Sequence, residues 1–119
     1  MYSPKGDIKM SRVGCDILRI SRIQEKLSHT EFIEHLFTDE EINLFKERKF
    51  SPQTITANFC AKEAYVKALG CGFGEIRPKD ISVLRKDNGA PFIVHNGKEI
   101  KVSLSHDGDY AFAVVVLED

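Results

Sequence analysis

The stretch that decides the fold is Asn58–Gly74, NFCAKEAYVKALGCGFG, an alanine-rich run that carries a glutamate and a lysine four residues apart and ends in closely spaced glycines. Its apolar residues recur with the period of an α-helix. Upstream, Ser51 followed by Pro52 offers a hydroxyl at the N-cap and a proline in the first turn, and Gly70 is placed as a C-cap. The sequence therefore predicts a long helix from about residue 52 to residue 69.

This helix has two different faces. Glu63 and Lys67 project about 40° apart, opposite an apolar stripe that is expected to pack in the interior. On spacing alone they form a solvent-exposed ion pair worth about 0.3 to 0.5 kcal/mol. Phe59 and Val66 share their side of the helix, however, which favours a face that lines a cleft or an interface. The members of the apolar stripe are Ala57, Ala61, Ala64, Tyr65, Ala68 and Leu69.

The glycines at 70, 72 and 74 follow a helix, whereas the glycines of a dinucleotide-binding fingerprint follow a strand and precede a helix. A tight connection from helix to strand is therefore favoured over a nucleotide-binding fold. Closely spaced glycines still allow a flat ligand to approach the backbone, so Gly72 is kept as a candidate contact for a nucleotide.

The remaining elements are predicted from periodicity and turn signals. Residues 13–17, VGCDI, are expected to form a strand whose end carries Asp16. Apolar residues at 20, 23 and 27 have helical spacing, and Thr38 with Glu41 forms a capping box that starts a second helix. Beyond residue 74, β-favouring runs alternate with the hairpin turns D-N-G, H-N-G and H-D-G-D. One strand, three helices and an antiparallel meander predict an α+β domain with the long helix packed on the sheet.

Composition narrows the class of protein. The chain has 119 residues, 17 basic and 18 acidic, without a long run of one charge, so neither a nucleic-acid stripe nor a membrane-surface patch is expected. No apolar run is long enough for a spanning helix or a signal peptide, and the protein is expected to be soluble and cytoplasmic. Because Met10 directly precedes the first patterned segment, residues 1–9 are interpreted as an extension and residues 10–119 as one domain.

The number and spacing of the cysteines argue against two further classes of protein. Cys15, Cys60 and Cys71 form an odd set without C-x-x-C spacing, which argues against a disulfide framework and against a zinc ribbon. Reduced thiols that fill small gaps are expected.

Three blocks together resemble the holo-acyl-carrier-protein synthase family of small 4′-phosphopantetheinyl transferases. They are VGCDILRISRI at 13–23, FCAKEAYVKALGCGFG at 59–74 and VSLSHDGDYAFAVVV at 102–116, in the order of the family. The intervening D-I-x-V at 80–83 and N-G-x-P at 88–91 match as well, so the resemblance covers nearly all of the chain from residue 13. It implies the fold of these transferases and the transfer of the phosphopantetheine arm of coenzyme A to a serine of apo acyl carrier protein. Adenosine 3′,5′-bisphosphate would be released, in the service of fatty acid biosynthesis.

The resemblance also assigns the chemistry. Asp16 and Glu63 would be ligands of Mg²⁺, whose remaining ligands come from water and the pyrophosphate, and the metal would act as Lewis acid and template. Lys67 would contact the phosphates and assist the leaving group, and His106 would bind a phosphate or orient the nucleotide. Glu63 or a metal-bound water is the candidate base for the attacking serine. From the residues alone, Asp16 could instead bond to backbone at a strand end, and His106 could be a turn residue.

The contacts to coenzyme A come from several segments. Arg48 and Lys49, which could also be a solvated helix end, are expected to meet its 3′-phosphate. The whole expected set is Arg48, Lys49, Lys67, Gly72, Asn88, Pro91 and His106. Asp107 and Asp109 are interpreted as turn residues and not as metal ligands.

Two departures from the family pattern concern charge. Members often carry an arginine where this chain has Asn58, so no cationic contact is expected there. Arg22 fits an arginine that docks the carrier protein, but Glu31 and His35 stand where relatives are frequently basic. Because acyl carrier proteins are acidic, docking should depend on opposite charge and on salt.

The short chain has a further implication. Related monomeric transferases are about twice as long and contain two similar halves, so a homo-oligomer is expected here, with a trimer suggested by the family. Asp16 and His106 could then face Glu63 and Lys67 across a subunit boundary. Two alternatives stay open at this point: a non-catalytic coenzyme A or nucleotide-binding module of the same fold, and a small oligomer in which Glu63 and Lys67 only pair at an interface.

Overall fold

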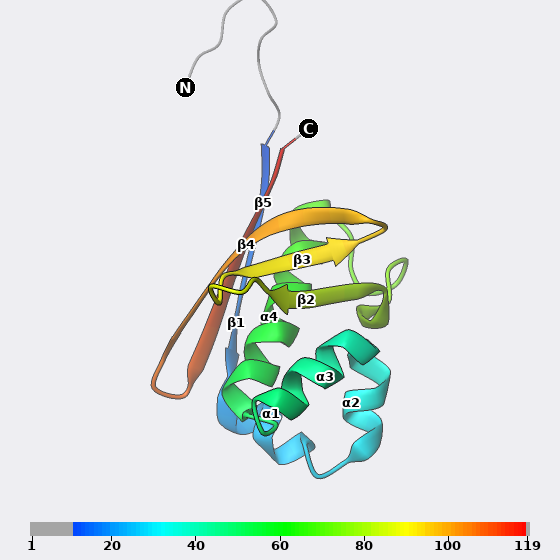
Figure 1. Cartoon of the computed structure of the whole chain (residues 1–119). Coiled ribbons are helices and arrows are strands. Elements are labelled where there is room, and N and C mark those ends of the chain that lie inside the picture. Colours follow the sequence, from blue (N-terminus) through cyan, green and yellow to red (C-terminus); the bar gives the residue numbers. More distant parts are fainter. Residues whose placement is uncertain (1–10, 119) are drawn as a thin grey trace, which may run out of the picture.

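The structure is a computed structural model that describes residues 11–118, in which a bundle of short helices lies beside a sheet that wraps a long helix (Figure 1). The extension expected at residues 1–9 lies outside the described residues. The elements follow in the order β1 (Ser11–Arg19), α1 (Ile20–Lys26), α2 (Thr30–Leu36), α3 (Asp39–Glu47), α4 (Pro52–Leu69), the 3-10 turn η1 (Pro78–Asp80), β2 (Ile81–Arg85), β3 (Pro91–His95), β4 (Lys98–Asp107) and β5 (Tyr110–Glu118). The predicted α+β class, with a long helix on an antiparallel sheet, is confirmed.

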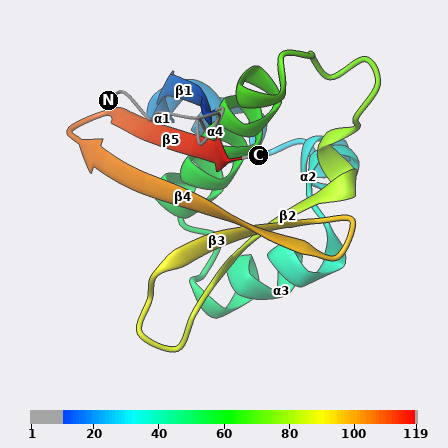
Figure 2. The ribbon, with the colours of Figure 1, turned by 90° about the horizontal axis from the view of Figure 1, so that it is seen from above.

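The sheet has the strand order β1-β5-β4-β3-β2, and every neighbouring pair is antiparallel. Strand β4 belongs to two halves of it: residues 98–101 pair with β3, and residues 102–107 pair with β5. Seen from above, β4 crosses from one half to the other; α4 packs against β1 and β5, and α3 packs against β2 (Figure 2). The turn Asn96–Gly97, with both φ angles positive, forms the predicted H-N-G hairpin.

Helix α4 begins and ends as the sequence predicts. The Ser51 hydroxyl accepts the Thr54 N–H, Pro52 is the first helical residue, and Gly70 ends the helix with a left-handed φ of 80°. The helix is buried on more sides than its alanine stripe suggests. Phe59 packs against aromatic rings of α2 and of the loop after α4, and Val66 is buried. The expectation that this side lines a cleft or an interface is therefore wrong for Val66, which is buried within the single chain, while Phe59 stays half-buried.

Helix α2 was not predicted. It has no side-chain N-cap hydrogen bond, so no local start signal marks it. Its side chains Phe32, Ile33 and Leu36 pack instead against a buried cluster built by the helices, and this tertiary contact stabilises the helix. The members of that cluster are Ile23, Phe37, Phe45 and Ile55.

Strand β1 is longer than the predicted 13–17 and passes very close to α4. A Cβ built on Gly14 would lie 2.0 Å from the Ala64 carbonyl oxygen and 2.5 Å from the Ala68 nitrogen, both of them backbone atoms. Only glycine permits this approach. Asp16, two residues further along the strand, faces the same side of the sheet and is thereby brought to α4.

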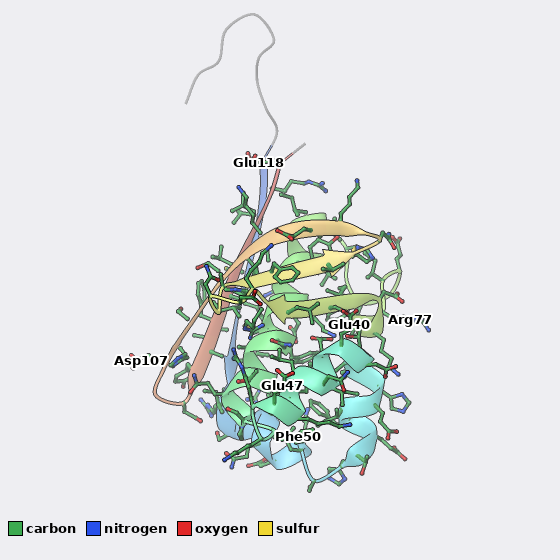
Figure 3. The ribbon with its side chains drawn as sticks, viewed as in Figure 1. Glu40, Glu47, Phe50, Arg77, Asp107 and Glu118 are labelled. Atoms are coloured by element: carbon green, nitrogen blue, oxygen red, sulfur yellow. The ribbon has the colours of Figure 1, made fainter. Side chains whose placement is uncertain are left out.

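The hairpin between β4 and β5 fixes the start of α1. Asp107 lies at the tip of this hairpin (Figure 3). The Asp109 carboxylate accepts hydrogen bonds from the Ser21 N–H at 2.9 Å and the Ser21 hydroxyl at 2.6 Å. The interpretation as a turn residue is confirmed for Asp109, which in addition anchors the helix that carries Arg22, whereas Asp107 is the last residue of β4 and pairs with Tyr110.

A buried ion pair ties the helices together. Lys62 on α4 is fully buried and donates to a Glu41 carboxylate oxygen, to the Leu36 carbonyl and to the Pro78 carbonyl. Glu41 also completes the predicted capping box with Thr38, whose N–H it accepts at 3.0 Å. No helix of residues 11–118 has both the length and the hydropathy needed to cross a membrane.

Candidate active site

The first functional side chain is Asp16 on β1. Its Oδ1 accepts a hydrogen bond from Lys67 Nζ at 2.9 Å, and the same ammonium donates to the Cys15 carbonyl at 3.2 Å. Its Oδ2 is buried and has no hydrogen-bond partner within the described chain. Because an unpaired buried carboxylate oxygen is costly, this atom marks a place where a cation or a donor would bind favourably. Lys67 thus forms its ion pair with Asp16, and the simple i, i+4 pair with Glu63 is not what the fold uses.

Glu63 lies directly beside Asp16. Partial burial and the neighbouring Asp16 charge raise the pKa of Glu63 to about 7, while Lys67 acts in the opposite direction. Two carboxyl groups that compete for one proton are also a pair that a divalent cation would neutralise. The carboxyls of Asp16 and Glu63 are adjacent within a single protomer, so the expectation that a subunit boundary could separate these two residues is wrong.

The donor set fits Mg²⁺. Within residues 11–118 no group of three or more His, Cys, Asp or Glu side chains gathers as a metal-binding cluster. Zinc sites use three or four such ligands, whereas Mg²⁺ is commonly held by one or two carboxylates and takes waters and substrate phosphates for the rest. Asp16 and Glu63, with one oxygen unpaired, are of the second kind.

Cys60 lies beneath the two carboxyls and is inert. Its thiol donates to the Asp16 carbonyl at 3.0 Å, which helps to hold β1 against α4. Burial, together with the charges of Asp16 and Glu63, raises the pKa of Cys60 to about 12, so the thiol stays protonated. All three cysteines are free, as the sequence predicts.

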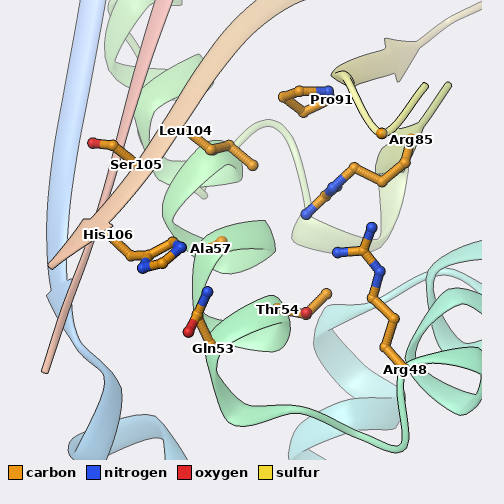
Figure 4. Close-up of a pocket in the computed structure, with 10 residues that line it drawn as sticks. Arg48, Gln53, Thr54, Ala57, Arg85, Pro91, Leu104, Ser105 and His106 are labelled. Carbon is orange, nitrogen blue, oxygen red and sulfur yellow. The ribbon is translucent and has the colours of Figure 1, made fainter. Parts of the chain in front are cut away.

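A pocket of about 220 Å³ opens between α4, β4 and the turn that joins β2 to β3 (Figure 4). Its cationic groups are the two guanidiniums of Arg48 and Arg85, and the imidazole of His106 and the amide of Gln53 also line it. No carboxylate is among the residues that line it, so the pocket suits an anion. The lining residues are Arg48, Gln53, Thr54, Ala57, Arg85, Gly89, Pro91, Leu104, Ser105 and His106.

The register of the sheet relates the pocket to the carboxyl pair. Leu104 pairs with Ala113, and Ala113 pairs with Asp16, so the pocket edge and the carboxyl lie in one cross-strand row. Two strand spacings separate them, about 10 Å. His106 belongs to the same face of β4, opposite Ala111, so the alternative that it is a turn residue is wrong.

Only some of the residues expected to contact coenzyme A lie in the pocket or at the carboxyl pair. Arg48, Pro91 and His106 line the pocket, and Lys67 lies with Asp16 and Glu63. Lys49 is not in the lining: the backbone turns after Arg48, with a positive φ of 56° at Lys49. Asn88 shapes the β2–β3 turn, where its side chain accepts the Ala90 N–H at 3.0 Å. Gly72 is exposed in the loop after α4, outside this pocket.

Sequence reasoning missed Arg85, Gln53, Thr54 and Ser105. Arg85 directly precedes the turn that carries the N-G-x-P element, and this proximity was the available signal. Asn58, where no cationic contact was expected, is buried and accepts a hydrogen bond from Arg85 at 2.9 Å.

Comparison with known proteins identifies the class. The family model described as the 4′-phosphopantetheinyl transferase superfamily matches residues 12–115. Curated relatives named holo-[acyl-carrier-protein] synthase include one from Geobacillus sp. (strain WCH70), 40% identical, and one from Clostridium botulinum (strain Eklund 17B / Type B), 41% identical. Each match covers 89% of this chain, with 94% and 95% of the respective relative.

Solved structures agree. The holo-(acyl-carrier-protein) synthase from Bacillus anthracis, in complex with CoA (3′,5′-ADP), superposes with a TM-score of 0.84 at 33% identity, over 94% of this chain and 99% of that one. The enzyme of the same name from Helicobacter pylori, in complex with coenzyme A, gives 0.77 at 32% identity, over 87% and 96%. The chain belongs to the 4′-phosphopantetheinyl transferase superfamily. Within it, the chain is similar over most of its length to holo-[acyl-carrier-protein] synthases.

Proposed function

We propose that this protein transfers the 4′-phosphopantetheine group of coenzyme A to a serine of apo acyl carrier protein and releases adenosine 3′,5′-bisphosphate. The observation that carries the proposal is the Asp16–Glu63 pair, with one unpaired oxygen, about two strands from a cationic pocket. The pair suits a metal-bound pyrophosphate, and the pocket suits the further phosphate of the same molecule. Fatty acid biosynthesis, in the cytoplasm, is the process that such a modified carrier protein would serve.

The site residues divide the work. Mg²⁺ held by Asp16 and Glu63 would neutralise the pyrophosphate and polarise its phosphoryl oxygens. Lys67, more than half exposed at its side chain, can turn from Asp16 toward the phosphate oxygens and stabilise negative charge on the departing group. The serine oxygen would form its bond to the β-phosphorus as the bond to the bridging oxygen breaks, and Glu63 or a metal-bound water would accept the hydroxyl proton.

The adenosine end would lie at the pocket. Arg48 and His106 would contribute positive and hydrogen-bonding groups for the 3′-phosphate, and Pro91, which lines the same pocket, would contact the base. Asn88 takes part by shaping that turn. Lys49 and Gly72 stay as expected contacts that would need a change of loop conformation to join them.

The carrier protein would dock on α1. Arg22 is exposed on this helix, whose start is anchored by Asp109. An acidic carrier protein would be attracted to this arginine, and the opposite charges would also raise the rate of encounter.

We infer that the protein is a homo-oligomer, and a trimer in keeping with the family. The face of β1 and β5 that points away from α4 is apolar and exposed: Val13 is 67% exposed, Ile17 59% and Val116 45%. These side chains form cross-strand neighbours, since Val13 pairs with Val116 and Ile17 pairs with Phe112. Burial of a second copy against this face would remove the patch from water.

The direct test is the intact mass of an apo acyl carrier protein after incubation with this protein, coenzyme A and Mg²⁺. We expect a gain of one phosphopantetheine group per carrier, and no gain with EDTA or with Glu63→Gln. If the parent protein binds coenzyme A in a calorimeter but leaves the carrier mass unchanged, the protein is a binding module and the proposed transfer is wrong.

A further inference from the structure

The side-chain amide of Asn58 is buried, and both its N–H donors and its oxygen form hydrogen bonds. Its Nδ2 donates to Glu41 Oε2 at 3.0 Å and to the Val83 carbonyl at 2.9 Å, and its Oδ1 accepts from Arg85 Nη2 at 2.9 Å. Two acceptors on one side and a guanidinium on the other fix which way the amide points. The side chain is therefore a rigid support for Arg85.

Arg85 keeps its charge without a direct acidic partner. Its recorded bonds go to the Asn58 amide oxygen and to the Leu84 carbonyl at 3.2 Å, two neutral acceptors that use two of its five N–H groups. Within residues 11–118, no ion pair includes Arg85, because Asn58 stands between it and Glu41. Burial and the charge of Arg48 lower the pKa of Arg85 to about 10, so the group is still protonated at neutral pH.

The two guanidiniums face one cavity. Figure 4 shows the guanidinium ends of Arg48 and Arg85 turned toward each other on one side of the pocket, with His106 on the other side. Like charges held this close repel, and a doubly charged anion between them would relieve the repulsion and satisfy the remaining N–H groups. The carboxyl pair accounts for the pyrophosphate of coenzyme A, so the anion left for the pocket is its ribose 3′-phosphate monoester.

We propose that Asn58 is a positioning residue that holds Arg85 opposite Arg48, and that this pair of arginines makes the enzyme select coenzyme A over the analogue that lacks the 3′-phosphate. The inference rests on the proposed transfer reaction and deepens it by naming the residues that set donor specificity. A neutral amide at position 58 is essential to it, because a carboxylate there would neutralise the guanidinium that the phosphate needs.

The first test compares coenzyme A with 3′-dephospho-coenzyme A as donors for Arg85→Met. We expect kcat/KM for coenzyme A to fall about 10- to 100-fold, as for loss of a charged hydrogen bond, with little change for the dephospho analogue. Lys86→Met is the matched control, because it removes the same charge at the next residue, where Lys86 is exposed and pairs with Glu99. Equal losses with both donors in Arg85→Met would show a structural role only and overturn the proposal.

The second test asks whether Asn58 acts through Arg85. Asn58→Ser should reduce the preference for coenzyme A in the parent but not in the Arg85→Met background, and Arg85→Lys should keep part of the preference because it keeps the charge. Additive losses in the double variant would contradict the positioning role. Thermal unfolding of each variant identifies any that fail to fold, and the Arg85 series alone then decides.

Binding without carrier protein separates this inference from the proposed reaction. In a calorimeter, adenosine 3′,5′-bisphosphate should bind more tightly than adenosine 5′-monophosphate, and Arg85→Met should remove most of the difference. If the parent shows this difference but transfers nothing, the reaction is wrong and the arginine pair stands. If it transfers normally and Arg85→Met leaves the difference intact, the arginine pair is wrong and the reaction stands.

Discussion

The pKa of Glu63 is set by a tertiary contact and not by its neighbours in the sequence. Its pKa is raised from 4.5 to about 7 because it is partly buried beside Asp16. Between pH 4.5 and about pH 7, Glu63 keeps its proton in the native protein but has lost it in the unfolded chain. Without metal, the free energy of unfolding should therefore fall as pH rises through this window, and the fall should level off about one pH unit above the raised pKa.

This pH dependence can be measured by urea unfolding at several pH values from 5 to 8 in EDTA. Glu63→Gln should flatten the slope that Glu63 contributes, because the variant has no proton to lose there. Glu75→Gln, an exposed glutamate in the loop after α4, is the control and should keep the parental slope. Identical slopes for Glu63→Gln and the parent would mean that the two carboxyls do not interact as the structure places them.

At this scale the sequence predicts which side chains are candidates for the site, but not which of them contact one another. The resemblance carried by the sequence blocks names Asp16, Glu63, Lys67 and His106 as site residues, and the structure brings the first three together. The partner of Lys67 is not predicted, because helical spacing points to Glu63, whereas the fold brings in Asp16 from β1. Such a pairing depends on how strand and helix cross, which local patterns do not contain.

At the scale of elements, the crossing of β1 and α4 depends on Gly14. In Gly14→Ala the new methyl would meet the Ala64 carbonyl oxygen at 2.0 Å, so β1 must move away from α4. We expect a loss of about 3 kcal/mol or more in the free energy of unfolding, and a fall in transfer rate because Asp16 moves with the strand. Urea denaturation gives the first quantity and carrier mass the second.

Gly74→Ala is the matched control for that substitution. A Cβ at Gly74 has no heavy atom within 4 Å, and its φ is not in the left-handed region. It should change stability by less than about 0.5 kcal/mol. A stable, active Gly14→Ala protein would show that the strand and the helix are further apart than described.

Helix α1 carries the proposed docking residue. Arg22→Glu should raise KM for acyl carrier protein about 3- to 10-fold and leave KM for coenzyme A unchanged, because the arginine is on α1 and not in the pocket. The parent should also lose affinity for the carrier as salt increases, and the variant less so. Equal KM values for the carrier in both proteins would place the docking surface elsewhere.

Elements with local signals were predicted with good boundaries, and elements without them were missed. Helix α4 has a serine cap, a first-turn proline and a C-cap glycine, and its bounds agree with the prediction. Helix α2 has no side-chain cap and exists because its apolar side chains reach a cluster built by other helices. The buried pair of Lys62 and Glu41 was missed for a related reason, since a lysine on a helix is usually exposed.

For the whole molecule, the apolar outer face of β1 and β5 predicts self-association. Ile17→Asp places a charge in the middle of this face and should dissociate the oligomer with little effect on the fold of the single chain, because Ile17 is 59% exposed there. Sedimentation velocity would report the change in mass, and circular dichroism would report the fold. Ser28→Asp, at an exposed position in the turn after α1 and away from the sheet, is the control. An unchanged sedimentation coefficient for Ile17→Asp would exclude this face as the interface.

Composition and turn signals predicted one α+β domain, but not how its distant parts assemble. The anion pocket takes Arg48 from the end of α3, Arg85 from β2 and His106 from β4, three segments that no spacing rule connects. The division of β4 between two halves of the sheet brings them together, and that division is a property of the complete topology.

The strand that carries Asp16 has β5 as its neighbour in the sheet, and Asp16 itself pairs with Ala113. During synthesis on a ribosome, β1 therefore has no partner strand until β5 has emerged from the exit tunnel. A nascent chain that already displays Glu63, Lys67 and the whole of α4 would still be unable to consume coenzyme A. The site around Asp16 can therefore form completely only after β5 has been translated.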